Sequence, residues 1–597
     1  MDLELQDKVN EAIEQLKLLS VDDINFQQMD PIAKMMLVAL VKETQKINDH
    51  IDNLDQRLVE RYCTDFIPRQ EVEAVPAIAL IQPTFKVNKD AESFPIESGA
   101  LFSYKVDQKK QPINYIPLFN TTAFPYSDII VVHQNNEYSR GVNMYKPNRL
   151  WVGLKTNMEV ESVKGLSLFI KGTSGVMPEH IYAGIDSHEL DFATSRELEQ
   201  IEMAEPFDAQ QASGQFFSLL GIWKEHLLNM EDASWIVITD DTQSRDIFKP
   251  RAYPKMFEQW NLTSTLETFE IAKPIWFQID FPEGYVVPEN CEVMLNVIPV
   301  VNVDVCSLTL TDHAPIAKLQ KQEDSFFLSI LETSVASHKQ GFGTLNDEII
   351  VRDFDAGCYH SGDLYRDIRN LYNRFIDDFY AFMDYNEVKD DKTQRQLREV
   401  VNRIANNSSI KDPNRKFKFD SGTYVMKNLS QSVQSSSIKV NYTTTQGKIG
   451  NMPKAGETMD AKKQLLVFDP KVPIIVNAMG GADKASADER YELLRYYSLT
   501  NDRLYTKMDV DAFLRKEIMT EFGKEEFKRI FINISIEGAE GATAVRRGLY
   551  VDISFKDKKN FDKAQGASFD KLLQQRIENK SCISMPIIVK LRNLEEV

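Results

Sequence analysis

Cysteine and histidine are scarce in this chain of 597 residues, and neither is spaced as in a metal site. The five cysteines lie far apart with no C-x-x-C pair, which excludes the usual zinc motifs and a disulfide framework. Among the eight histidines, His188 precedes Glu189 as in a zincin helix, but no histidine stands four positions after His188. We therefore expect no metal cofactor, and scattered thiols in a reducing cytoplasm.

The sequence also lacks the motifs of phosphate and acyl chemistry. Residues 480–484, Gly-Gly-Ala-Asp-Lys, do not have the G-x-x-x-x-G-K-[ST] spacing that surrounds a phosphate with amides. No G-x-S-x-G nucleophile elbow occurs. The acidic pairs at 377–378 and 390–391 stand near basic residues, as on solvated helix faces. The sequence predicts a protein without enzymatic activity and without a cofactor.

A basic excess and long apolar runs are missing as well. With 70 Lys and Arg against 89 Asp and Glu the net charge is −19, which argues against charge-driven binding of nucleic acid or anionic lipid and still allows a small basic patch. No apolar run reaches the roughly eighteen residues of a membrane span. The N-terminus, Met-Asp-Leu-Glu, lacks the basic and apolar regions of a signal peptide. We expect a cytoplasmic protein without membrane insertion.

The length and composition of the sequence predict several packed domains. A chain of this length predicts ~3–4 domains. Hydrophobic content of 43% and charged content of 27% are those of an ordinary globular protein. The overall prediction is a multidomain α+β fold. Its regions are a helical bundle segment over 1–66, a β-rich region over 67–345, a helix with polar loops over 346–460, and an α+β module over 461–597.

The first region has the periodicity of two helices. Apolar residues step by three and four positions from Leu5 to Leu19, and again from Leu40 to Leu58, with Asp30-Pro31 at the second start. Such a seam needs a partner helix, which either belongs to another subunit or is supplied by this chain. The predicted interface residues are Leu40, Ile47, Ile51, Leu54 and Leu58.

Strand patterns dominate the second region and polar segments the third. A helix over 216–230 interrupts the strands and carries Leu219, Leu220, Trp223 and Leu227 at helical spacing. Such a region predicts a sandwich of one or two subdomains. An aromatic-rich helix is expected over 364–385, followed by loops to residue 445. The strand-like runs are 75–81, 128–133, 150–154, 166–171, 234–239, 275–280 and 293–301.

The last region shows the clearest local signals. Ser486 and Glu489 have the spacing of a capping box, and Thr506 opens a second helix. Further helix and strand patterns cover 569–578 and 586–591. We expect helices on one face of a small antiparallel sheet. Strict alternation predicts two half-buried strands, with Ile530, Ile532, Ile534 and Ile536 in one and Leu549, Val551, Ile553 and Phe555 in the other.

Several stretches, in chain order, resemble the TssF family of type VI secretion system baseplate wedge subunits. The best match is 291–303, which resembles the family's L-x-x-x-P-V-x-N-L-F segment. Around Gly99 the chain departs from the family, because the usual arginine and threonine of that turn are missing. The other resembling stretches are 30–54, the proline-led strand 75–82, 94–101, 150–171 and 440–450.

The C-terminal region carries a second resemblance. Gly480-Gly481-Ala482-Asp483, Glu489-Arg490-Tyr491 and residues 499–503 resemble the baseplate J proteins of contractile phages. TssF proteins are regarded as related to such wedge proteins, so the two resemblances agree.

The resemblance implies a cytoplasmic scaffold in a baseplate docked at the inner membrane complex. In the family, two TssF-like copies join one TssG-like subunit in a wedge. That wedge contacts TssK-like adaptors, the TssE-like sheath initiator and a VgrG-like spike hub, initiates sheath assembly and transmits contraction. A phage or phage-tail-like contractile particle would share these features, and a neighbouring gene for a TssK-like adaptor would distinguish the two. A surface adhesin would need an export signal, and an enzyme in 67–345 would need a bound metal or nucleotide.

Overall fold

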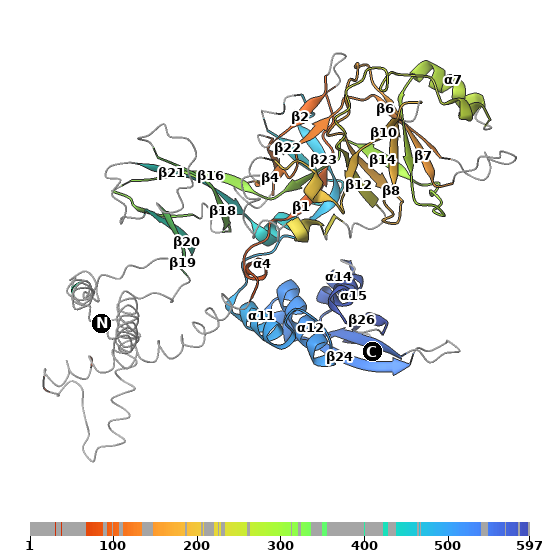
Figure 1. Cartoon of the computed structure of the whole chain (residues 1–597). Coiled ribbons are helices and arrows are strands. Elements are labelled where there is room, and N and C mark those ends of the chain that lie inside the picture. Colours follow the sequence, from red (N-terminus) through yellow and green to blue (C-terminus); the bar gives the residue numbers. More distant parts are fainter. Residues whose placement is uncertain are drawn as a thin grey trace, which may run out of the picture. The chain divides into compact units, whose positions relative to one another are not determined.

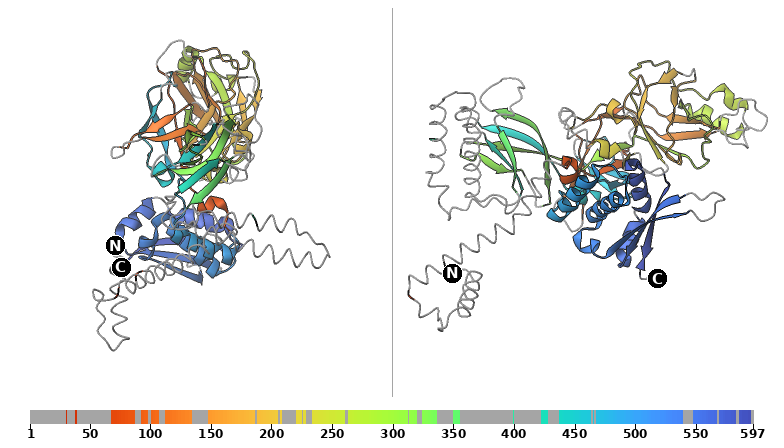
Figure 2. Two further views of the ribbon diagram at one scale, coloured as in Figure 1. Left: turned by 90° about the vertical axis from the view of Figure 1, so that its left-hand side faces the viewer. Right: turned by 60° about the horizontal axis from the view of Figure 1, so that its bottom comes forward.

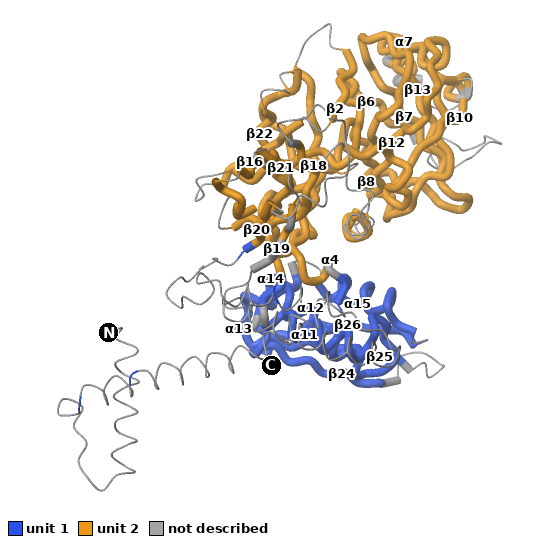
Figure 3. The backbone as a smooth tube through the Cα atoms, turned by 60° about the vertical axis from the view of Figure 1, so that its left-hand side comes forward, with its two compact units in different colours: residues 1–68, 353–422, 485–597 blue, residues 69–352, 423–484 orange. Residues whose placement is uncertain are grey.

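The fold is taken from a computed structural model, which divides the chain into two compact units (Figure 3). Unit 1 comprises residues 1–68, 353–422 and 485–597, and unit 2 comprises residues 69–352 and 423–484. The residues that the structure describes are 30, 38, 67–86, 92–97, 100–106, 112–133, 147–185, 188–204, 207, 220–224, 226–227, 233–259, 263–311, 313–319, 324–335, 349–354, 399, 422–427, 437–462, 465, 467–538, 547–566, 569–582 and 585–594.

Unit 2 contains a closed six-stranded barrel, in the order β1-β15-β4-β3-β22-β23. Its first strand pairs on one side with β15 and on the other with β23, although these strands are hundreds of residues apart in sequence. Alternate side chains fill the interior, including Phe102, Tyr115 and Val472. The strands are β1 (Ile78–Ile81), β3 (Phe102–Tyr104), β4 (Ile113–Pro117), β15 (Ile298–Val301), β22 (Thr458–Ala461) and β23 (Lys471–Met479).

Beside the barrel lies an antiparallel sandwich, which confirms the predicted β-rich character of this region. A five-stranded sheet, β10-β9-β13-β7-β6, and a four-stranded sheet, β11-β12-β8-β14, share a core of residues such as Val152, Ile170 and Ile236. The strands are β6 (Asp128–His133), β7 (Arg149–Lys155), β8 (Ser167–Lys171), β9 (His180–Ala183), β10 (His188–Leu190), β11 (Phe192–Thr194), β12 (Ala233–Ile238), β13 (Ile275–Asp280) and β14 (Glu292–Leu295).

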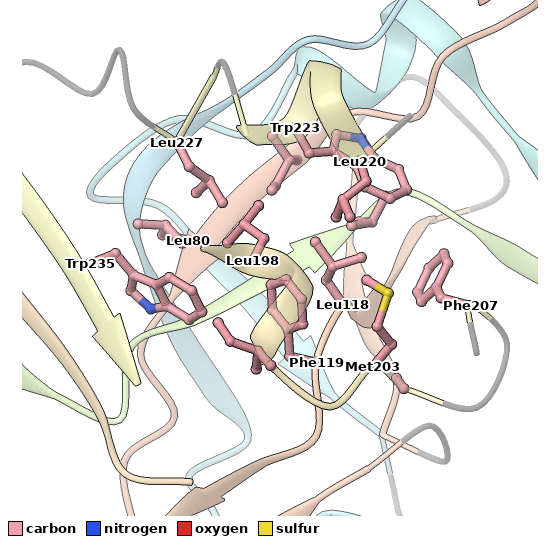
Figure 4. Packing of buried hydrophobic residues seen from close by; sticks show 14 of the residues in the cluster. Leu80, Leu118, Phe119, Leu198, Met203, Phe207, Leu220, Trp223, Leu227 and Trp235 are labelled. Carbon is pink, nitrogen blue, oxygen red and sulfur yellow. The ribbon is translucent and has the colours of Figure 1, made fainter. Parts of the chain in front are cut away.

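A second core joins the barrel to the four-stranded sheet. Trp235 stacks on Phe119, and Leu80 of the barrel belongs to the same cluster (Figure 4). The predicted helix over 216–230 is helical at its described positions, and its Leu220, Trp223 and Leu227 are buried here. The short helical elements of unit 2 are α4 (Arg69–Val72), η2 (Leu198–Gln200), η3 (Lys255–Gln259), α7 (Thr263–Ala272) and η4 (Gly447–Asn451).

The span predicted as polar loops before residue 445 contains strands instead. Val440 and Tyr442 of β21 are buried, and the hydroxyls of Ser329 and Thr443 are 2.8 Å apart across the pair β18–β21. Threonine is a good strand former, so a polar alternation there suits a sheet. Of the strands in this part of unit 2, β20 (Gly422–Lys427) and β21 (Ile438–Thr445) lie in that span. They pair in two three-stranded sheets with β16 (Asp304–Leu310), β17 (Ile316–Lys318), β18 (Phe326–Val335) and β19 (Ile349–Phe354), and β2 (Phe94–Ile96) and β5 (Thr121–Ala123) form a separate pair.

The C-terminal module of unit 1, residues 485–594, places helices on one face of a three-stranded sheet (Figures 1 and 2). Both predicted helix starts are confirmed, since Ser486 with Glu489 and Thr506 with Asp509 form complete capping boxes. Its elements are α11 (Ala487–Thr500), α12 (Lys507–Phe522), α13 (Lys524–Phe527), β24 (Ile530–Gly538), β25 (Arg547–Phe555), α14 (Lys558–Gly566), α15 (Phe569–Lys580) and β26 (Ile587–Asn593).

Two expectations for this end of the chain are corrected. The sheet is mixed, because β25 runs antiparallel to β24 but parallel to β26. The helices α14 and α15 provide the long crossover that a parallel pair needs. The strand β23, which lies within the module expected over 461–597, pairs in the barrel of unit 2, as does β22 at the boundary of that module.

A buried ion cluster holds the helical layer of the module together. The Arg576 guanidinium lies 2.6 Å from the Glu517 carboxylate, and the Lys516 ammonium lies 3.4 Å from it and 5.3 Å from the Tyr496 ring centroid. Burial raises the pKa of Glu517, but the charges of Arg576 and Lys516 and the Arg576 hydrogen bond lower it more, so the pKa falls to about 2.

The helical segments predicted over 1–66 and 364–385 lie outside the described residues, apart from isolated positions. No helix among the described residues is long and apolar enough to cross a membrane.

Candidate functional site at the end of the barrel

A single buried asparagine joins several segments at one end of the barrel. Asn302 directly follows β15 and its side chain is 1% exposed. Its backbone N–H donates to the Ala77 carbonyl at 2.8 Å, and its side-chain amide donates to the Asn114 carbonyl at 2.8 Å. Its side-chain oxygen accepts from the Gln446 backbone N–H at 2.9 Å and from the Thr445 hydroxyl at 3.1 Å. Through its backbone and side chain, this one residue therefore ties the start of β1, the strand β4 and the end of β21 together.

The helix η4 and the glycine turn after β23 complete this junction. Asn451 and Gly481 pair through two hydrogen bonds of 2.8 Å, one in each direction. The Asp483 carboxylate accepts from the Lys448 backbone N–H at 2.8 Å. Val75 and Ala482 form an isolated antiparallel bridge. We call these hydrogen-bonded segments, 75–77, 302, 445–451 and 480–483, the barrel junction.

Two glycines make the close approach of these segments feasible. A Cβ added to Gly450 would lie 2.8 Å from the Asn302 side-chain oxygen and 2.9 Å from the Ala77 Cβ. A Cβ added to Gly481 would also lie 2.9 Å from the Ala77 Cβ. Real side chains do not tolerate such separations without a shift of the backbone. The junction therefore requires glycine at both positions.

Two buried aromatic side chains donate hydrogen bonds to backbone carbonyls of the barrel junction. The Tyr115 hydroxyl donates to the Gly450 carbonyl, and the Trp223 indole donates to the Pro76 carbonyl at 3.1 Å. Both rings are completely buried. Burial, with a smaller contribution from nearby Tyr104, raises the pKa of Tyr115 well above its usual value, so the hydroxyl stays a donor.

The chemistry of the barrel junction suits rigidity rather than catalysis. The bonds above engage its side-chain amides and the Asp483 carboxylate with neighbouring backbone groups, and its one ammonium group belongs to the exposed Lys448. Among the described residues, no three His, Cys, Asp or Glu side chains lie together as metal ligands. Satisfied buried networks of this kind fix one arrangement of the segments that they join.

The junction unites stretches that the sequence analysis treated separately. The resembling segments 75–82, 291–303, 440–450 and 480–483 all contribute to it. The sequence reasoning did not identify Asn302 as their common partner. A signal for it exists, because an asparagine directly after the apolar run 297–301 is a polar group delivered to a buried strand end. The predicted interface residues lie outside the described residues and stay a prediction: Leu40, Ile47, Ile51, Leu54 and Leu58.

No protein-family model matches the chain, and no curated protein matches it. Among solved structures, it is similar to a chain of the type VI secretion system TssK-TssF-TssG baseplate subcomplex, with 11% identity, coverage of 94% of this chain and 95% of that chain, and a TM-score of 0.41. It is similar to a chain of the baseplate complex from the type VI secretion system, with 9% identity, coverage of 99% and 96%, and a TM-score of 0.34. It is also similar to a chain of the anti-feeding prophage baseplate, with 9% identity, coverage of 98% and 70%, and a TM-score of 0.28. All three solved structures are baseplates or baseplate subcomplexes, and the first contains TssF, the family that the sequence resembles.

Proposed function

We propose that this protein is a structural wedge subunit of a type VI secretion system baseplate. The observation that carries the proposal is the barrel junction, in which four stretches resembling TssF and baseplate J proteins meet in one hydrogen-bonded arrangement. These stretches were identified separately in the sequence, and in the fold they contact one another, which supports the resemblance as a whole. The alternative is a baseplate subunit of a phage or phage-tail-like contractile particle.

The construction of the junction fits a part that transmits load. Its bonds join segments from the beginning, middle and end of unit 2, so a force on one segment passes to the others. The buried hydrogen bonds of the junction resist rearrangement, because a movement that breaks one of them leaves a buried polar group unsatisfied. In this role the protein would initiate sheath assembly and pass on the signal to contract.

The proposed partners follow from the same role. They are a second copy of this chain, a TssG-like subunit, a TssK-like adaptor, a TssE-like sheath initiator and a VgrG-like spike hub. The complex would assemble in the cytoplasm and dock at the inner membrane complex. No cofactor enters this function.

Co-expression with the products of neighbouring genes tests the proposal. We expect the mass of the purified complex, measured by native mass spectrometry, to correspond to two copies of this chain with one TssG-like subunit. A TssK-like gene beside it favours the secretion system over the phage-like particle. A chain that stays monomeric with every neighbouring product would contradict both.

Replacement of Ile47 and Ile51 with aspartate should abolish co-purification with the TssG-like subunit or the second copy. The physical reason is that charges in an apolar helix seam lose their hydration on association. The measurement is pull-down of tagged protein, with amide hydrogen exchange of β1 and β15 to verify that the barrel stays folded. Ile271→Asp, at a side chain 83% exposed on α7, is the matched control and should leave the complex intact. If the double variant forms the complex as the parent does, Ile47 and Ile51 do not belong to the interface.

A further inference from the structure

The C-terminal sheet turns one set of side chains away from its helices. The inner face holds Leu549, Val551, Ile553 and Phe555, each at most 1% exposed. The alternate positions form what we call the outer face of the C-terminal sheet. Its register sets Phe531 beside Ser554 and Arg592, Asn533 beside Asp552 and Lys590, and Ser535 beside Tyr550 and Ile588.

This outer face is open to solvent in the structure. Phe531 is 48% exposed, the Arg592 side chain is 57% exposed, and Asn533 and Lys590 are exposed as well. Phe531 stands near the start of the edge strand β24, and an aromatic ring exposed there gains free energy when another surface covers it. The face therefore has the character of an interface.

Cations lie directly over the aromatic rings of this face. The Lys556 ammonium is 5.3 Å from the Phe531 ring centroid, and the Lys590 ammonium is 5.6 Å from the Tyr550 ring centroid. Arg592 pairs with Asp552 at 2.9 Å, and the other carboxylate on this side of the register is Glu537, opposite Gly548 near the end of β24. Lys556 and Lys590 thus place two positive charges beside two aromatic rings.

The positive charge of this face contrasts with the rest of the chain. Residues 485–597 contain 20 of the 70 basic and 19 of the 89 acidic residues, so this part has a net charge of +1 and the remaining residues have −20. The outer face carries three basic side chains, Lys556, Lys590 and Arg592, against the two carboxylates Asp552 and Glu537. It therefore has a small basic excess on a strongly acidic protein, which favours a partner of opposite sign.

We propose that the outer face of the C-terminal sheet binds an acidic protein segment that also carries apolar side chains. Lys556 and Lys590 pair with its carboxylates, and Phe531 and Tyr550 cover its apolar side chains. Nucleic acid fits less well, because its affinity comes from neutralising many phosphates with basic side chains, and this face offers few of them with Asp552 in its central row. This proposed binding rests on the residues of the outer face and does not depend on a baseplate role.

Fluorescence anisotropy with the full chain tests the surface directly. The probe is a labelled soluble peptide rich in glutamate with interspersed leucines, and the matched probe replaces every glutamate with glutamine. We expect binding of the glutamate peptide that weakens as salt is added, and little binding of the glutamine peptide. Labelled oligothymidylate is the third probe. Preference for oligothymidylate, equal binding of both peptides, or no peptide binding would each overturn the proposal.

Variants then locate the binding. Lys556→Glu with Lys590→Glu should weaken binding of the glutamate peptide by about tenfold or more, because attraction becomes like-charge repulsion. Phe531→Ser should weaken it without changing its salt dependence. The control is Lys559→Glu with Lys571→Glu, at exposed positions on α14 and α15, which should bind as the parent does. Hydrogen exchange of β25 verifies that the sheet is folded in each variant. Equal loss in the control would place the binding elsewhere and refute the assignment.

Discussion

Alanine in place of Asn302 is expected to lower the free energy of unfolding of the barrel by about 3–4 kcal/mol. The substitution leaves the Asn114 carbonyl, the Gln446 N–H and the Thr445 hydroxyl without the partner that they have now. Each buried polar group left unsatisfied costs about 1–3 kcal/mol, although such costs are not fully additive. The loss should appear as faster amide hydrogen exchange in β1, β15 and η4.

The control for this prediction is a second asparagine, whose side chain forms a hydrogen bond outside the barrel junction. Asn441 lies on β21 and makes one long side-chain bond, 3.3 Å to Glu332 across the strand pair. Asn441→Ala should cost well under about 1 kcal/mol, as for a solvated hydrogen bond. If the two alanine variants exchange alike, Asn302 does not hold the segments together and the load-transmitting role of the barrel junction fails with it.

The sequence predicts the helices of the C-terminal module well because their signals are local. Ser486 with Glu489 and Thr506 with Asp509 lie three residues apart, and each capping box forms as expected. The alternation of Leu549, Val551, Ile553 and Phe555 likewise predicts a strand whose inner face is buried. Such patterns depend on neighbours in the chain, so a sequence alone contains them.

Local sequence patterns do not show which distant strands pair with each other. The parallel pair β25–β26 and the entry of β22 and β23 into the barrel depend on which strands compete for each edge. Nothing in 471–479 distinguishes a partner in the barrel from one in the C-terminal sheet. Asn302 shows the same limit, because its polarity is visible in the sequence but its side-chain partners Asn114 and Gln446 are 188 and 144 positions away.

Replacement of Arg576 with methionine should destabilise the C-terminal module by about 3–5 kcal/mol, the usual result when one partner of a buried ion pair is removed. Methionine keeps most of the packing volume, so the loss reports charge rather than a cavity. Glu517 then keeps Lys516 as its near cation, at 3.4 Å. Amide exchange of α12 and β25 measures the change. Arg529→Met, at a pair in which the arginine side chain is 59% exposed, is the control and should cost about 1 kcal/mol or less.

The dependence of this effect on pH separates the ion pair from general loss of packing. In the folded protein the pKa of Glu517 is about 2, below the roughly 4.3 of an unfolded glutamate. A lowered carboxyl pKa gives stability that is fully present above pH ~4–5 and is lost as the pH falls towards about 2. Without Arg576, burial outweighs the remaining attraction, so the folded pKa rises towards or above the unfolded value. The parent module should therefore lose stability between about pH 5 and pH 2, and the variant should lose much less over the same range. If the free energies of unfolding of parent and variant change alike between about pH 5 and pH 2, Arg576 acts through packing. The reason is that Glu517 is the group whose titration in this range the substitution is expected to change.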